Sequence, residues 1–310
     1  MAGNRTTVTE FFLLGFQGHE PLNILLFVVI FLAYVITLTG DCLIIAVVSK
    51  SQRLQYPMFY LLKHLSVSEI LFTGNITPNM LYILLRDGGT MSFAGCIIQF
   101  YLYIASGTVE SLILTAMSYD RYLAICNPLR YTDMMNLQHC QALVIASWIL
   151  SFTVVLITII LLCQLEFCDS NIIDHFFCDF APLVDLSCSD SSIVRIEVVV
   201  LSIPVVASTF SFIIWTYMCI FLTILRISSV MGRQKAFSTC SSHLTSVCSY
   251  YGPLIVIYMV PYQKHSHVVT KFLSILYTVV TPLFNPLIYS LRNEELRNVL
   301  WKFLNIKMII

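Results

Sequence analysis

Long apolar runs dominate the chain and occur seven times. They cover about residues 21–48, 57–85, 92–119, 140–164, 198–225, 236–263 and 272–291. Each reaches or nears the ~20 residues that an α-helix needs to cross the hydrocarbon core of a bilayer. Only helices and closed barrels satisfy their backbone in lipid, and these runs are too long and continuous for barrel strands. The pattern therefore predicts an all-α membrane protein with seven spanning helices.

Apolar residues also recur at three-and-four spacing after the seventh run, with Glu and Arg side chains on the opposite face. The apolar set comprises Leu296, Val299, Leu300, Phe303 and Leu304. Such a pattern is typical of an amphipathic helix that lies in the membrane interface. The fold prediction is therefore a seven-transmembrane helix bundle with a short amphipathic eighth helix.

Composition supports a membrane location, and the basic residues set its orientation. Hydrophobic residues make up 58% of the 310-residue chain and charged residues 11%, whereas a soluble domain carries about 25% charged residues. Twelve of the 17 Lys and Arg residues fall on one side of the predicted spans and five on the other. Because the basic side is cytoplasmic, seven spans place the N-terminus outside the plasma membrane and the C-terminus inside. Asn4, in the sequon Asn4-Arg5-Thr6, is then accessible to glycosylation.

This orientation divides the chain into three parts. Residues 1–20 form an extracellular tail, residues 21–291 the seven-helix domain, and residues 292–310 the amphipathic helix and cytoplasmic tail. The second extracellular loop, about residues 165–196, is the longest. No enzyme domain is evident, and no nucleophile–base pair or metal-ligand spacing indicates catalysis. His243 and Cys240 are too few for a metal site, so we interpret them as packing or partner-facing residues.

The stretch from Met117 to Pro128 closes the third apolar run with an adjacent acid and base, Asp120 and Arg121. Charges at the end of a bilayer-length helix lie where water begins. One interpretation is an ordinary helix end at the membrane surface. The other is a switch, in which Asp120 holds Arg121 at rest and releases it to a cytoplasmic partner on activation.

Three acids, Asp41, Glu69 and Glu110, lie inside apolar runs. Each costs at least ~2.5 kcal/mol at mid-membrane, so we expect it to face the interior of the bundle and to have a partner. If the three meet, they cannot all be ionised without a cation between them. Either a cation or protonated, hydrogen-bonded carboxyls would resolve the conflict.

Four cysteines lie outside the apolar interior, on the oxidising side of the membrane. Cys96 lies at the outer start of the third helix, and Cys168, Cys178 and Cys188 follow one another at intervals of ten in the long loop. Four cysteines allow three pairings, and spacing alone does not choose among them.

Short motifs occur in order along the whole chain. They are Phe12-Leu13-Leu14-Gly15-Phe16, Pro57-Met58-Phe59-Tyr60, Met117 to Pro128, Lys235 to Leu244, Tyr250-Tyr251-Gly252 and Pro282 to Asn293. This ordered set resembles that of the olfactory receptors, a family of rhodopsin-like (class A) G-protein-coupled receptors. The chain departs from the family at Gly40-Asp41, where Gly-Asn is usual, at Ser118, and at Tyr56-Pro57-Met58-Phe59-Tyr60. Of these departures, only Asp41 adds a charged side chain, and it lies inside a predicted membrane span.

The resemblance implies roles for residues that spacing leaves open. It implies the disulfides Cys96–Cys178 and Cys168–Cys188, and a sodium site at Glu69 and Glu110 with Asp41 and Asn285 nearby. No other cofactor is implied. It also implies a G-protein switch made of Asp120, Arg121, Tyr122, Tyr217, Asn285, Pro286 and Tyr289.

The resemblance further implies a ligand site in the outer half of the bundle. Its candidate lining is Tyr103, Ile104, Gly107, Thr108, Ser202, Ile203, Val206, Tyr251, Ile255, Tyr258, Ile275 and Thr278. Such an apolar lining with a few hydroxyls suits a small, largely neutral odorant. The implied partners are the olfactory stimulatory heterotrimeric G protein, which raises cyclic AMP, and trafficking chaperones.

Two rival functions stay open at this point. A receptor of the same fold could serve an endogenous metabolite outside the olfactory epithelium, and only expression data separate that reading from the first. An ion-coupled transporter would use the intramembrane acids. However, no inverted repeat or pair of broken helices is evident, and the Asp120–Arg121 pair would then have no role.

Overall fold

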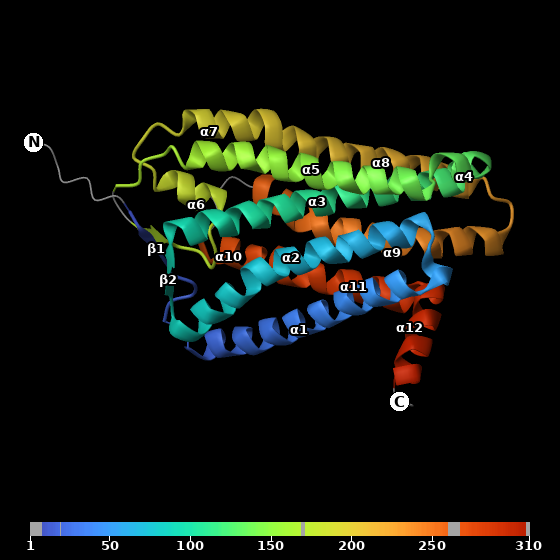
Figure 1. Ribbon diagram of the computed structural model, residues 1–310, viewed down its shortest axis with the longest axis horizontal. Coiled ribbons are helices and arrows are strands. Elements are labelled where there is room, and N and C mark those ends of the chain that lie inside the picture. Colours follow the sequence, from blue (N-terminus) through green and yellow to red (C-terminus); the bar gives the residue numbers. More distant parts are fainter. Residues whose placement is uncertain (1–7, 19, 169–170, 260–266, 308–310) are drawn as a thin grey trace, which may run out of the picture.

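The computed structural model describes residues 8–18, 20–168, 171–259 and 267–307, and its long helices lie side by side (Figure 1). The spanning helices are α1 (Glu20–Lys50), α2 (Pro57–Arg86), α3 (Phe93–Cys126), α5 (Leu137–Leu162), α7–α8 (Ser192–Glu197 and Ile203–Leu225), α9 (Val230–Met259) and α10–α11 (His267–Ile275 and Thr281–Arg292). Five of them are long and apolar enough to cross a membrane by composition alone. The more polar α2 and α9 complete the seven-helix bundle that the sequence predicts.

Several helices extend beyond the apolar runs that reveal them. α3 continues to Cys126, so Asp120 and Arg121 lie within the helix and not at its end. Asn127 precedes Pro128, a position that disfavours helical backbone, and α3 stops there. α7 begins at Ser192, so the second extracellular loop is shorter than the range 165–196 expected from hydropathy. Hydropathy reveals only the apolar part of a helix. The backbone hydrogen bonds of the helix continue into the more polar residues at its ends.

Two prolines lie two residues after the end of a π-helical segment. Val198–Ser202 precedes Pro204, and Leu276–Val280 precedes Pro282. Proline has no N–H to donate to the carbonyl four residues earlier, and a wider π-helical turn is one way in which a helix absorbs that loss. Pro253 and Pro286 lie inside continuous helices, and Pro261 lies outside the described residues.

A small sheet caps the outer end of the bundle, next to the helix ends at the left of Figure 1. β1 (Glu10–Leu13) pairs antiparallel with β2 (Gly89–Ser92) and parallel with β3 (Ile172–Ile173). Phe11 and Leu13 of β1 are 0% and 1% exposed. The N-terminal segment, expected as a plain tail, therefore folds into the cap, and the all-α prediction needs this addition.

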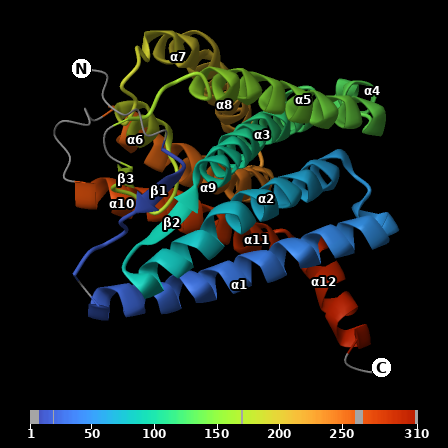
Figure 2. The same cartoon turned by 60° about the vertical axis from the view of Figure 1, so that its left-hand side comes forward.

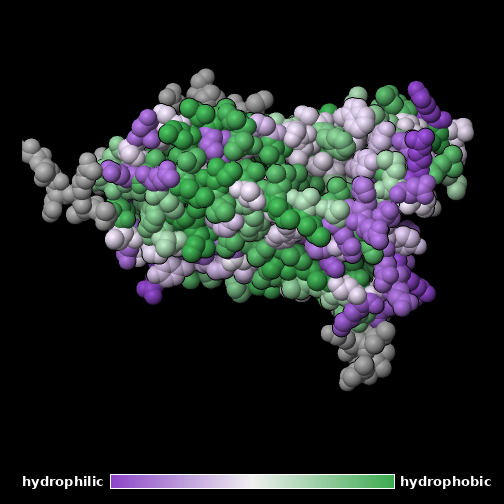
Figure 3. All heavy atoms as spheres, turned by 45° about the horizontal axis from the view of Figure 1, so that its top comes forward, coloured by the Kyte–Doolittle hydropathy of each residue, from purple (hydrophilic) through white to green (hydrophobic). Residues whose placement is uncertain are grey.

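The interior contains one hydrophobic cluster at the outer end and another at the inner end. α3 lies at the centre and packs against α2, α5, α8 and α9. On the face shown in Figure 3, hydrophobic side chains cover most of the middle, and hydrophilic side chains gather mainly at the right-hand end. α12 (Glu294–Lys307) projects away from the bundle (Figure 2), with Leu296 buried against the inner cluster. Its place on the inner leaflet stays a prediction.

Candidate ligand and signalling sites

Two disulfides fix the long loop between α5 and α7, which the sequence predicts to be extracellular. Cys96 at the start of α3 is bonded to Cys178, with Cα atoms 5.5 Å apart, and Cys168 to Cys188, with Cα atoms 6.1 Å apart. These are the two pairings that the family resemblance implies. The first holds the loop over the outer end of the bundle, and the second closes the loop on itself.

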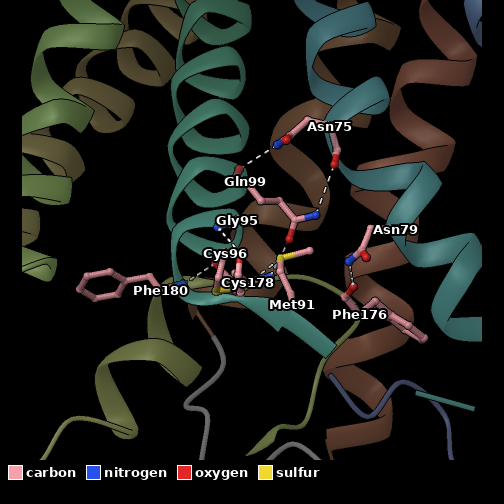
Figure 4. Close-up of a disulfide and its surroundings, with 11 residues drawn as sticks. Asn75, Asn79, Met91, Gly95, Cys96, Gln99, Phe176, Cys178 and Phe180 are labelled. Carbon is pink, nitrogen blue, oxygen red and sulfur yellow. Dashed lines mark hydrogen bonds between the residues drawn. A yellow bond between two sulfur atoms is a disulfide. The ribbon is translucent and has the colours of Figure 1, made fainter. Parts of the chain in front are cut away.

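Polar side chains of α2 and α3 bind the same loop next to the first disulfide (Figure 4). Gln99, only 4% exposed, accepts a hydrogen bond from the Cys178 N–H at 3.1 Å. The main-chain carbonyl of Gln99 accepts a hydrogen bond from Asn75 Nδ2 at 2.7 Å. Asn79 Nδ2 donates to the Phe176 carbonyl at 3.3 Å. The backbone of the loop is therefore held at several points over the outer half of the bundle.

α10 holds the cap from the other side. The Lys271 ammonium, on a residue only 5% exposed, forms an ion pair with Asp174 and donates to the Gly15 carbonyl at 2.6 Å. One turn deeper, His175 Nε2 lies 3.0 Å from Ser274 Oγ. Burial, and secondly the Lys271 charge, lower the pKa of His175 to about 4. His175 is therefore neutral at physiological pH.

Beneath the cap, Tyr103 occupies the centre of the predicted ligand site. Its hydroxyl is hydrogen-bonded to that of Tyr277. The Phe72 ring lies 5.5 Å and the Phe177 ring 5.2 Å from the Tyr103 ring, measured between centroids. The Tyr103–Tyr277 hydroxyl pair therefore lies within an aromatic enclosure, close to the outer loop.

The other predicted lining residues that face inward are mostly half-buried. Ile104, Gly107, Thr108, Ser202 and Val206 are half-buried, and Tyr251, Ile275 and Thr278 are buried. Thr108 and Thr278 donate their hydroxyl protons to carbonyls of their own helices, at 2.9 and 2.7 Å. Tyr251 donates to Thr209 on α8 at 3.0 Å. Many of the hydroxyls are therefore already engaged within the protein.

Two of the predicted lining residues lie elsewhere. Ile203 is 52% exposed, because α8 turns Val206 and Thr209 inward and Ile203 toward the outside of the bundle. This prediction is wrong, since a one-residue step along a helix changes the facing direction by ~100°. Ile255 is 38% exposed, so it lies at the surface of α9 and not in the interior. The Tyr258 side chain and Asn4 lie outside the described part of the chain.

At the inner end, Asp120 is fully buried and forms an ion pair with Arg121. Arg121 Nε donates to Asp120 Oδ2 at 2.9 Å, and the Tyr131 hydroxyl of α4 (Tyr131–Met134) donates to Asp120 Oδ1 at 2.8 Å. Burial and the Asp120 carboxylate raise the pKa of Tyr131, so its phenol keeps the proton that this bond needs. Both oxygens of Asp120 are engaged, and Arg121 is directed at Asp120.

The remaining switch residues lie on α3, α8 and α11. The Tyr122 ring packs against Trp215 with centroids 5.3 Å apart, and the Tyr217 hydroxyl lies 2.6 Å from His243 Nδ1. Pro286 lies so close to Gly40 that a Cβ at position 40 would approach it to 2.7 Å, and Tyr289 is 0% exposed. In the structure the Tyr217 hydroxyl thus has His243 as a partner, a contact that the sequence did not reveal.

Glu69 and Glu110 meet at Asn285 in the middle of the bundle. The Asn285 amide donates to Glu69 and, at 3.4 Å, to Glu110, and all three residues are at most 2% exposed. One oxygen of Glu69, Asn285 Oδ1 and both oxygens of Asp41 accept no hydrogen bond from the described residues. Buried acceptors without donors are the kind of atoms that a cation would satisfy.

Asp41 does not complete a set of metal ligands with the two glutamates. Among the described residues, no three His, Cys, Asp or Glu side chains gather as a metal site. A sodium ion here would be held by the carboxylates of Glu69 and Glu110, to which the Asn285 amide nitrogen points, with the fully buried Asp41 nearby. Oxygen ligands of this kind fit a hard cation.

Comparison with known proteins agrees with this architecture. The family model described as "Olfactory receptor" matches residues 30–307. Human olfactory receptor 11A1 is 43% identical over 98% of this chain and 96% of its own, and mouse olfactory receptor 5P73 is 44% identical over 99% and 93%. Human olfactory receptor 6J1 is 46% identical over 96% and 86%.

The fold also matches a solved structure. Squid rhodopsin superposes with a TM-score of 0.74 and 15% identity, over 94% of this chain and 88% of its own. At this identity the match concerns the fold, a seven-helix bundle. Taken with the family match, it makes the chain a multi-pass membrane protein and a signalling receptor, not an enzyme. The chain belongs to the olfactory receptor family of odorant-sensing G-protein-coupled receptors.

Proposed function

We propose that the protein binds a small, mostly apolar odorant between the cap and the middle of the bundle and then activates the olfactory stimulatory G protein, which raises cyclic AMP. The observation that carries the proposal is the hydroxyl pair of Tyr103 and Tyr277 inside an aromatic enclosure. Such a site offers shape, apolar contact and one hydrogen bond, the combination that a small neutral molecule needs.

The inner end supports the signalling half of the proposal. Arg121 is 13% exposed at its side chain and is held by Asp120, which Tyr131 also engages. A ligand favours the active state only if it binds that state more tightly than the resting one. We propose that this preference moves α9 outward and frees Arg121 for the G protein, with the N-terminus outside the cell and the C-terminus inside.

The test is a chemically diverse odorant panel applied to cells that carry a cyclic-AMP reporter and a surface-tagged receptor. An agonist should raise cyclic AMP in the wild type. Arg121→Ala should abolish the response while the receptor stays at the surface, because the freed guanidinium is missing. A retained response in Arg121→Ala at matched surface level would contradict the assignment of Arg121.

We further propose that Glu69, Glu110 and Asn285 hold a sodium ion that stabilises the resting bundle. The unpartnered buried oxygens support this site. Replacing extracellular sodium by N-methyl-D-glucamine should raise basal cyclic AMP in the wild type, and Glu110→Gln should remove that dependence. Glu20→Gln, at the exposed start of α1, is the matched control. A wild-type signal that is unchanged across sodium concentrations would contradict the site.

A further inference from the structure

A groove lies on the surface of the molecule between α1 and α12, and we call it the α1–α12 groove. It encloses about 430 Å³, and its walls include Leu38, Leu43 and Ala46 of α1 and Phe303 of α12. Lys50, the last residue of α1, lines its inner end. α12 contacts α1 here before it leaves the bundle (Figure 2). The groove is therefore formed by one spanning helix and the C-terminal helix.

The groove follows one face of α1 over the depth of one membrane leaflet. Leu38, Cys42, Ala46 and Lys50 line it at intervals of four residues, so they share a face of the helix. The helix rises by about 18 Å between Leu38 and Lys50, and one leaflet of the hydrocarbon core is about 15 Å thick. A chain that lies in the groove therefore reaches from the middle of the bilayer to the level of the head groups.

The walls of the groove suit a hydrocarbon chain. The Thr39 hydroxyl donates to the Val35 carbonyl of the same helix at 2.6 Å, so it is already engaged within α1. The thiol of Cys42 behaves as a small hydrophobic group. An acyl chain that enters the groove thus gains apolar contact without breaking a hydrogen bond of the protein.

Lys50 gives the inner end of the groove a positive charge. Its ammonium lies 5.6 Å from the centre of the Phe303 ring, and among the residues that the structure describes it forms no ion pair with a carboxylate. Arg53 and Lys302, close to these two residues in the sequence, are exposed and also basic. A lysine ammonium has three N–H donors, and the cytoplasmic leaflet is rich in anionic lipids. The charge at this end of the groove is therefore complementary to a lipid phosphate.

We propose that the α1–α12 groove binds an anionic phospholipid of the inner leaflet, with one acyl chain along Leu38, Leu43 and Ala46 and its phosphate at Lys50. The hydrocarbon chain fills the apolar walls, and the phosphate satisfies the ammonium. In the cell this site requires the C-terminal end of the molecule to face the cytoplasm, as in the proposed function. It depends on neither an odorant nor a G protein.

The test uses the full-length receptor in phosphatidylcholine nanodiscs that contain a small fraction of a photoreactive lipid. Two probes, a phosphatidylserine and a phosphatidylcholine, carry the same diazirine-bearing acyl chain. After irradiation, mass spectrometry quantifies labelling of residues 38–50 and of a reference, residues 145–160 of α5, where Ile145, Ile149 and Ile160 are exposed. One basic side chain near the membrane surface favours an anionic lipid about fivefold. Phosphatidylserine should therefore label the groove about fivefold more than phosphatidylcholine, whereas the two should label α5 within about twofold of each other.

Three variants separate the contributions of charge and shape. Lys50→Met keeps most of the side-chain length and should reduce the preference of the groove for phosphatidylserine to within about twofold. Arg226→Met is the matched control, because Arg226 is an exposed basic residue at the inner end of α8, and it should leave the preference unchanged. Ala46→Leu fills part of the groove and should lower its labelling by both probes about fivefold, with no change at α5.

Equal labelling of the wild-type groove by the two probes would identify an ordinary boundary lipid and overturn the proposal. A preference that persists in Lys50→Met would overturn it as well. Weak labelling by both probes, together with cross-links between the α1 helices of two receptors, would assign the groove to a second copy of the chain and contradict a lipid site. Because the measurement contains no agonist and no heterotrimer, its outcome is independent of whether the proposed function holds.

Discussion

Tyr103 and Tyr277 place two hydroxyl groups in contact between α3 and the π-helical segment Leu276–Val280. In such a pair one hydroxyl donates to the other, and one proton is left over for a third group. An odorant that carries an oxygen atom can accept this proton, whereas a hydrocarbon of the same shape cannot. The pair therefore offers selectivity for the polar atom of a ligand.

Tyr277→Phe should accordingly raise the half-maximal concentration of an oxygen-bearing agonist about five- to tenfold in the cyclic-AMP assay. A hydrocarbon analogue, where it activates, should change by less than about twofold. Tyr101→Phe is the matched control, since the Tyr101 hydroxyl donates to the Phe152 carbonyl of α5 at 3.3 Å. Equal shifts for both agonists would mean that Tyr277 contributes only packing.

His175 makes the stability of the cap depend on pH. Its pKa in the folded protein is about 4, below the ordinary value of 6.5. The unfolded cap therefore binds the proton more readily, and stability is complete above pH 6.5 and falls as the pH is lowered toward 4. Hydrogen exchange of residues 172–178, corrected for intrinsic rates, should lose on the order of tenfold protection between pH 7 and 5. His175→Gln should flatten this profile, and a profile that keeps its slope would contradict the assignment.

The sequence did not reveal Tyr277 as a site residue, and the reason is local. Family position selects Ile275 and Thr278 on this helix, as on a regular α-helix. In the π-helical turn the three consecutive residues Tyr277, Thr278 and Val279 are all buried, because the wider turn changes which side chains face inward. Proline signals at positions 282 and 286 indicate irregular helix, but they do not say which residues it turns inward.

At the scale of elements, α10 joins the N-terminal segment to the long loop between α5 and α7. Lys271 bonds Gly15 on one and Asp174 on the other. Gly15 has a φ of +62°, and a Cβ there would lie 2.7 Å from Ile83, so the chain needs glycine to reach this contact. One buried ammonium thus holds two segments that are far apart in the sequence.

Lys271→Met keeps most of the side-chain length and removes the charge. Hydrogen exchange of residues 10–16 and 172–177 should increase about tenfold or more, because a buried charge-assisted contact is lost to both segments. Arg195→Met is the control, since it breaks the ion pair with Asp185, in which both side chains are about half exposed and which should contribute little. An equal response in both variants would show that burial of Lys271 adds nothing.

The periodicity of the sequence predicted the spanning helices but not the short strands. Spans such as α1 and α5 were evident because nearly every residue is apolar. β1 was not, because its four residues, Glu10–Leu13, are too few to show the alternation of a strand, and its partners are distant in sequence. The contact of Tyr217 with His243 was missed for the same reason, since a helix pattern gives a facing direction but not the partner across the bundle.

For the whole molecule, the outer and inner hydrophobic clusters share α3 as their common element. Tyr103 lies in the outer cluster, and Val109, Ile113 and Met117 lie in the inner one. A ligand that changes the packing around Tyr103 therefore acts on the same helix that carries Arg121. Spacing predicted that Arg121 lies toward the inner end of α3, whereas the outer ligand site and the closeness of Glu69, Glu110 and Asn285 came from the family resemblance and the fold.

The most direct measurement of the central claim is nucleotide exchange on the stimulatory heterotrimer by the purified receptor, with and without a saturating, verified agonist. The account predicts that agonist accelerates exchange by wild type and not by Arg121→Ala. Failure of the wild type to accelerate exchange on this or any other heterotrimer would contradict the claim that ligand binding beneath the cap exposes Arg121 at the opposite end.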